Sequence, residues 1–178
     1  SYPLGTQDLA PVMKGAKAAN PDAFVAWSYP PDTFALAELA KIEGLNVKAY
    51  YSAVATCFPG FAAKYGKSAE AVLGAGGINP DAPEMKGYYD THKKLTGTDA
   101  DYWAGPVTYA SLQVLEQAIE GVGAPDRAAV TEYIKKNSFK TVLGDWTFKD
   151  QVIQNVWTVG QWQGGKFYGV ASTGKPGE

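Results

Sequence analysis

Apolar and polar positions along residues 1–77 alternate in a way that predicts strands and helices in turn. The continuous apolar run at 23–27 is typical of a parallel strand covered on both faces. Segments with apolar residues three and four positions apart predict amphipathic helices, and Asp8 is placed to cap the first of them. The predicted strands are residues 23–27, 47–55 and 71–73, and the predicted helices are residues 8–19, 30–42 and 58–65. Three such units in series indicate an α/β fold with a parallel, doubly wound sheet.

The pattern changes after Gly77, where residues 78–83 form a Pro-rich segment typical of a crossing between two parts of a molecule. Helical spacing returns beyond it, and Asp126 is placed as the N-cap of the last helix. The end of the chain alternates as strands do, and the Gly-Gly pair at 164–165 predicts a β-hairpin. These later elements are helices at 83–95, 107–122 and from 127, and strands at 141–143, 146–148, 156–162 and 167–170.

The helices between residues 83 and 137 carry wide apolar faces without parallel strands of their own to cover them. Such faces must be buried by other polypeptide. We expect either that these helices fold back on the first part of the chain or that they belong to a sheet whose strands lie outside this chain.

Composition narrows the classes of partner. The chain has 178 residues and is 46% hydrophobic, which is enough for a substantial core. A net charge of -2 leaves no basic face for phosphates, so a nucleic-acid partner is not expected. Neither a membrane span nor a signal peptide is predicted, because no long apolar run and no basic start followed by an apolar stretch occur. An aromatic content of 13% favours a pocket for an apolar ligand.

Candidate catalytic and metal-binding groups are sparse. His92 is the single histidine and lies in a polar stretch of a predicted helix, so nucleophilic catalysis is not expected. Cys57 stands alone without a nearby cation to lower its pKa, and one Cys with one distant His does not make a metal site. The glycines at 74–77 lack the spacing of a dinucleotide loop. We therefore predict no enzyme, no metal and no cofactor.

The candidate ligand site lies in the loops after the first two predicted strands, because open α/β sheets bind ligands beyond the carboxyl ends of their strands. The first loop offers the Ser28 hydroxyl, the Tyr29 ring and the amides of a helix N-terminus, which stabilise a carboxylate. Asp32 is expected chiefly to cap that helix. The second loop contributes Val54, Ala55 and Thr56.

Several segments, in this order, resemble the type I periplasmic binding proteins of the branched-chain amino-acid (Leu/Ile/Val) transport family. The resemblance extends over nearly the whole chain and corresponds to the later part of such proteins. Its segments are Tyr2 to Asp8, Ala18 to Ala23, Asp101 to Gln113, Thr141 to Gly144, and Gly160-Gln161-Trp162.

The resemblance assigns roles to particular site residues. Tyr29 matches an aromatic residue of the second lobe that closes on the ligand, and Tyr109 matches an aromatic residue at the start of a long first-lobe helix. Amino-acid binders of the family carry an acid after the next strand, where an ungapped comparison places Val54; a small loop shift would bring Thr56 there instead. A buried ammonium without a partner is costly. The expected solute is therefore a small carboxylate, aromatic or apolar.

The resemblance also implies an organisation. The fold is expected to have two α/β lobes, with the front part of the first lobe missing from this chain. Residues 1–77 would form the second lobe, residues 78–146 the helices of the first lobe, and residues 147–178 the last crossing and a terminal hairpin. Hinges are expected at 78–81 and 147–155.

The implied protein is a periplasmic receptor, monomeric when complete, that presents its solute to an ABC permease in the inner membrane. The alternatives are an amino-acid-binding member of the same family, a sensory ligand-binding domain with the same fold, and a hydrolase that uses His92.

Overall fold

A computed structural model describes residues 1–3, 5–79, 81–153 and 158–172. Its main sheet has five strands in the order β1-β2-β3-β8-β9. The first three strands are parallel, and β8 and β9 join them antiparallel, so that Gly74 of β3 pairs with Gly160 of β8. The strands are β1 (Ala23–Ala26), β2 (Ala49–Ser52), β3 (Leu73–Ala75), β8 (Thr158–Gln163) and β9 (Lys166–Ser172). The predicted α/β fold is confirmed, with a mixed sheet because the predicted hairpin pairs with the parallel strands.

Four helical segments cover one face of this sheet. Phe24 and Tyr50 lie on the covered face and their rings stack with centroids 5.2 Å apart. Phe61 and Tyr65 extend the packing to Trp162 at the other end of the sheet. The segments are α1 (Ala10–Ala18), α2 (Pro30–Glu43), α3 (Pro59–Tyr65) and the 3-10 turn η1 (Gly66–Ala69). We call these segments and the five strands the sheet unit.

The opposite face of the sheet is open at its β1 end. Side chains alternate along a strand, so Val25 and Trp27 point away from the helices, and they are 57% and 75% exposed. The expectation that β1 is covered on both faces is therefore wrong for this chain. The physical reason is that all three helices of the sheet unit lie on the same side.

A second body, the helical unit, is built around the long helix α5 (Ala104–Val122). One side of α5 buries Ala110, Val114 and Ala118 against α6 and two small hairpins. Its other side leaves Leu112 59% and Leu115 44% exposed. The remaining elements of this unit are α6 (Arg127–Lys136), β4 (Phe139–Thr141), β5 (Gly144–Trp146), β6 (Phe148–Lys149) and β7 (Val152–Ile153). The two hairpins thus cover part of the apolar helix surface for which the sequence predicted no covering parallel strands.

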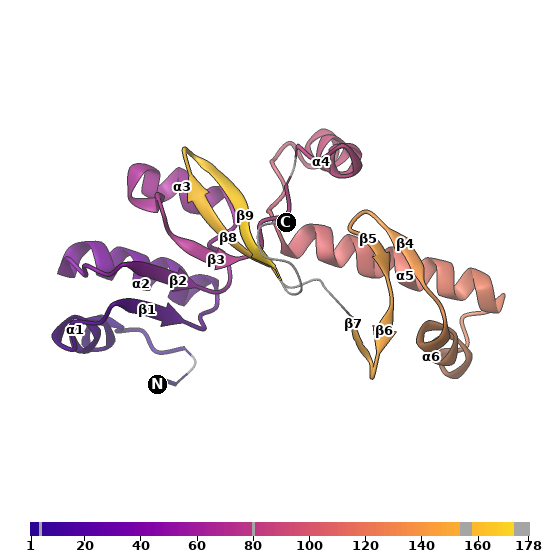
Figure 1. Ribbon diagram of the computed structural model, residues 1–178, viewed down its shortest axis with the longest axis horizontal. Helices are drawn as coiled ribbons and strands as arrows, with labels where there is room; N and C mark the ends of the chain where they lie inside the picture. The colour runs from indigo at the N-terminus through magenta and orange to yellow at the C-terminus, as the bar shows by residue number, and fades with distance from the viewer. Residues whose placement is uncertain (4, 80, 154–157, 173–178) are drawn as a thin grey trace.

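The two units meet near the middle of the molecule (Figure 1). The amides of Gly77 and Ile78 both donate to the carbonyl of Tyr102, with N···O distances of 3.2 and 3.0 Å. The amide of Tyr102 in turn donates to the carbonyl of Cys57 at 3.3 Å. Backbone hydrogen bonds therefore fix the start of the predicted hinge at 78–81. Pro80 and the end of the other predicted hinge, residues 154–155, lie outside the described residues.

Local details refine the predicted boundaries. Asp126 caps α6 as predicted, and its Oδ1 accepts a hydrogen bond from the Ala129 amide at 2.7 Å. Asp8 is not the N-cap of α1, because that helix begins after Leu9; the Asp8 carboxylate instead accepts from the Ala10 amide at 2.9 Å. Helix α4 (Pro83–Thr96) matches its prediction closely. None of the helices in the described ranges is long and apolar enough to cross a membrane.

Candidate ligand-binding site

The two loops predicted to hold a ligand lie side by side and are bonded to each other. The amide of Val54 donates to the carbonyl of Ser28 at 3.2 Å. The hydroxyl of Thr33 donates to the carbonyl of Val54 at 2.6 Å and lies 2.6 Å from the Ser28 hydroxyl. Ser28 and Thr33 are buried. The loops after β1 and β2 are therefore one connected structure at the carboxyl edge of the sheet.

Two aromatic side chains project from this edge. Tyr29, directly before α2, is 61% exposed, and Trp27, directly after β1, is 75% exposed. Both line a cavity of about 410 Å³. The Trp27 ring also meets Tyr51 edge-on at 5.6 Å. The sequence indicated Tyr29 but not Trp27, because Trp27 ends an apolar run that reads as a buried strand.

The N-terminus of α2 offers a carboxylate fewer amides than expected. Pro30 and Pro31 open the helix and have no N–H group. The amide of Thr33 is already bonded to the carbonyl of Tyr29 at 2.8 Å. Asp32 stands in the same turn and does not cap the helix with its side chain, because Tyr29 is the N-cap residue. This helix end therefore offers fewer free amides than expected, and its stabilisation of a carboxylate stays a prediction.

Asp32 lies instead against the N-terminal segment. It is 9% exposed and in the first turn of α2. Burial, and then the Asp32 carboxylate, raise the pKa of Tyr2 above its usual value. Asp32 is the one acidic residue of the two loops, residues 28–33 and 53–56.

The loop after β2 turns inward. Ala55 is fully buried with a φ of 73°, which is the left-handed region that residues other than glycine seldom adopt. The hydroxyl of Thr56 is also buried and donates to the carbonyl of Ser52 at 2.7 Å. Among residues 54–56, the half-buried Val54 therefore forms the surface of this loop, and the polar side chain of Thr56 does not.

Tyr109 lies on the other unit, near the start of α5, and is 45% exposed. Its ring lies 5.2 Å from that of Tyr88 on α4. The structure thus brings Ser28, Tyr29 and the residues from Val54 to Thr56 together, whereas Tyr109 belongs to a separate surface. Their roles as ligand contacts remain predictions.

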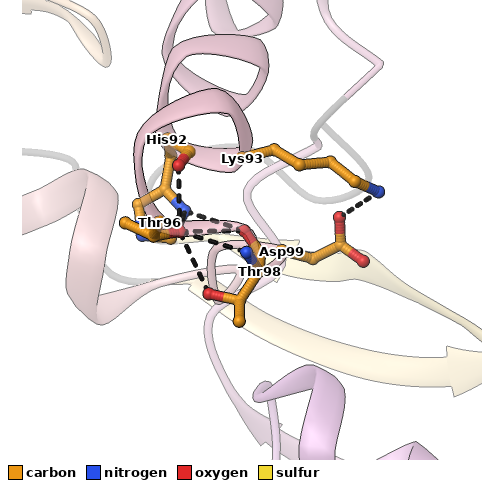
Figure 2. A network of polar contacts seen from close by, with 5 residues as sticks. All are labelled: His92, Lys93, Thr96, Thr98 and Asp99. Atoms are coloured by element: carbon orange, nitrogen blue, oxygen red, sulfur yellow. Dashed lines mark hydrogen bonds and ion pairs between the residues drawn. The ribbon is translucent and has the colours of Figure 1, made fainter.

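His92 takes part in a network at the end of α4 (Figure 2). Its Nδ1 lies 3.2 Å from the carbonyl of Thr98, and the Thr96 hydroxyl donates to the His92 carbonyl at 2.9 Å. Lys93 forms an ion pair with Asp99 beside it, at 2.8 Å. These contacts fix the chain where it leaves the helix. Within the described ranges, no group of three or more His, Cys, Asp or Glu side chains is arranged to hold a metal ion.

A sheet with parallel strands, with Trp27 and Tyr29 exposed beyond its first strand and a second, helical unit beside it, is typical of two-part α/β proteins that bind ligands. The chain belongs to the periplasmic binding protein family, because the family model of that description matches residues 1–166. The resemblance found in the sequence is thereby confirmed. A comparison with curated proteins gives no match.

Solved structures of solute-binding proteins share the fold. A leucine-binding protein, LivK, from Thermotoga maritima superposes with a TM-score of 0.79 at 21% identity, over 96% of this chain and 50% of that one. A leucine-, isoleucine-, valine-, threonine- and alanine-binding protein from Brucella ovis gives 0.79 at 21% identity, over 99% and 49%. A solute-binding protein from R. palustris in complex with benzoate gives 0.78 at 14% identity, over 96% and 48%. The chain spans about half the length of these proteins.

Proposed function

We propose that this chain is part of the substrate-binding component of an ABC importer, and that it binds a small carboxylate with an aromatic or apolar body. Trp27 and Tyr29 carry this proposal. They are large, exposed aromatic side chains that follow β1, at the edge where α/β sheets bind ligands, and both line one cavity together with Asp32. An apolar solute would bury part of their surface.

Known structures of the same fold support this range of solutes. The Thermotoga protein is a leucine-binding protein, and the R. palustris protein was solved with benzoate. Both solutes carry a carboxylate on an apolar body, whereas only leucine carries an ammonium. The question for this chain is therefore whether its site offers an anionic partner to the ammonium of a solute.

Val54 argues against an ammonium. It occupies the exposed part of the loop after β2, and its neighbours Ala55 and Thr56 are buried. A charged ammonium removed from water without an anionic partner costs several kcal/mol. A carboxylate without an ammonium, such as benzoate, makes no such demand on this loop.

The proposed receptor also includes parts of the protein beyond this edge of the sheet. In this proposal, residues 1–77 and the terminal hairpin form one lobe, and residues 78–146 belong to the other. Tyr109 then faces the solute from the second lobe, and polypeptide outside this chain covers the open sheet face and supplies the groups that hold the carboxylate. The complete protein would act as a periplasmic monomer and deliver its solute to an inner-membrane permease.

Matched pairs of solutes test the proposal in the complete protein. 4-Methylpentanoate differs from leucine only by the α-ammonium, and 3-phenylpropanoate differs from phenylalanine in the same way. Isothermal titration calorimetry is expected to show tighter binding of the ammonium-free member of at least one pair, with benzoate as a further probe. Tighter binding of both amino acids would overturn the preference, and no binding of any of the five acids would overturn the solute class.

Asp32 favours a second candidate, an amino-acid-binding protein. It is the acid of the two loops and lies three residues from Tyr29. It lines the same cavity as Trp27 and Tyr29, although it is only 9% exposed and lies against Tyr2. If the amino acids bind more tightly, Asp32→Asn is expected to abolish that advantage.

A further inference from the structure

The loop after β2 is held by a tryptophan that lies more than a hundred residues away in sequence. The indole Nε1 of Trp162, on β8, donates a hydrogen bond to the carbonyl of Thr56, with a distance of 2.7 Å. Trp162 is 2% exposed. A buried hydrogen bond of this length is well formed, and the removal of its donor leaves a buried carbonyl without that partner.

Trp162 is itself rigidly placed. Its amide donates to the carbonyl of Val72 at 3.1 Å, and its carbonyl accepts from the amide of Ala71 at 2.9 Å. Its ring lies 5.2 Å from that of Phe167 and meets Tyr102 edge-on at 6.0 Å. The indole is therefore a fixed donor and not a side chain that adapts to the loop.

The loop requires such a fixed partner. Ala55 has a φ of 73° while fully buried, and this conformation costs free energy for a residue with a Cβ. Backbone strain of this kind persists only where surrounding contacts determine the conformation. The Thr56 hydroxyl is already bonded to Ser52, so the Thr56 carbonyl is the group through which β8 reaches the loop.

The same loop is connected to the entrance of the helical unit. The carbonyl of Cys57 accepts from the amide of Tyr102 at 3.3 Å, and Tyr102 comes two residues before α5 begins. Trp162 and Tyr102 thus each hold a backbone carbonyl of the segment that follows Val54.

We propose that Trp162 is a positioning residue for solute binding: it holds the loop of Val54, Ala55 and Thr56 in the conformation that faces the solute, without touching the solute itself. This inference rests on the proposed function, because it takes that loop to be part of the ligand site.

Two replacements at position 162 in the complete protein test the proposal. Trp162→Phe removes the N–H donor together with part of the ring. Replacement of Trp162 by 3-benzothienylalanine exchanges the N–H for sulfur and keeps the shape, so it isolates the donor even if the phenylalanine variant folds poorly. Trp146→Phe is the matched control, because Trp146 is 4% exposed in the separate core of the helical unit.

Two readouts separate positioning from general stability. The first is affinity for benzoate and for leucine, by calorimetry. The second is hydrogen exchange of the Phe58 amide, which donates to the Ala55 carbonyl at 3.0 Å and so reports on the strained turn. Both replacements at 162 are expected to weaken binding of the preferred acid about fivefold, the equivalent of one lost hydrogen bond, and to accelerate exchange at Phe58. Trp146→Phe is expected to do neither.

Unchanged affinity in the folded 3-benzothienylalanine variant would overturn the proposal, as would an equal loss of affinity in Trp146→Phe. Unchanged exchange at Phe58 would overturn it too. If the unsubstituted protein binds neither benzoate nor leucine, the proposed solute class fails; the exchange rates still decide whether Trp162 holds the loop.

Discussion

The hydroxyl of Thr33 donates to the carbonyl of Val54 at 2.6 Å and so ties the first turn of α2 to the loop after β2. The same hydroxyl lies 2.6 Å from that of Ser28, and both side chains are buried. The Thr33 side chain therefore joins both loops of the candidate site.

Thr33→Val is expected to lower the free energy of unfolding by about 2 kcal/mol, because it leaves two buried polar groups without this partner while nearly preserving volume. Urea denaturation of the complete protein measures the change. Thr131→Val is the control: the Thr131 hydroxyl is exposed and bonds to the preceding helical turn at Arg127. A loss at Thr33 no larger than that at Thr131 would contradict the assigned role.

Gly74 is a position where β3 passes close to the loop after β2. A Cβ at this position would lie 2.5 Å from the Cβ of Thr56 and 3.0 Å from the carbonyl oxygen of Ser52. Gly74→Ala must move either the loop or the strand, and we expect it to destabilise the protein by about 2 to 3 kcal/mol. Gly87→Ala, in α4, meets nothing within 4 Å; it is expected to raise stability by up to about 1 kcal/mol. Thermal or urea unfolding of the two variants should change in opposite directions.

The sequence predicted the elements well where local chemistry determines them. Helix α2 begins at the Pro30-Pro31 pair and ends at Gly44, whose φ of 62° suits glycine at a helix end. The order of the strands in the sheet could not be predicted in this way, because strand pairing joins segments that lie far apart in the sequence. Nothing local to β8 indicates that it pairs with β3, and this pairing brings Trp162 to Thr56.

The candidate site, like the fold, could be predicted from the sequence only in part. The rule that ligands bind beyond parallel strands located both loops, and the structure bonds them together through Ser28 and Val54. The rule does not say which side chains face outward. Thr56 turns inward because the left-handed Ala55 reverses the chain, and Trp27 is exposed because the helices lie on one face.

Cys57 makes stability depend on pH in the alkaline range. Burial raises its pKa to about 12, with a further contribution from Asp101. The buried thiol stays protonated in a pH range where the thiol of the unfolded chain ionises. Its contribution to the free energy of unfolding is therefore complete below about pH 8, and it is lost as the pH rises towards the pKa of the folded protein. Between about pH 8 and pH 10, the unsubstituted protein is expected to lose about 1.5 kcal/mol more unfolding free energy than Cys57→Ala. Urea titrations under reducing conditions measure this difference, and equal losses would show that Cys57 does not contribute it.

Val54 offers the most direct change of solute preference. Val54→Glu would place a carboxylate on the half-buried surface of the loop after β2, beside the Ser28 carbonyl that accepts from the Val54 amide. A carboxylate near a bound ammonium stabilises it, whereas it repels a solute whose only charge is negative. In the complete protein the variant is therefore expected to shift the affinity ratio of leucine to 4-methylpentanoate towards leucine by at least about tenfold, or about 1.4 kcal/mol. Val54→Gln has the same shape without the charge and should leave the ratio within about twofold. Calorimetry with both acids gives the ratios, and an equal shift in the two variants would mean that size rather than charge at this position selects the solute.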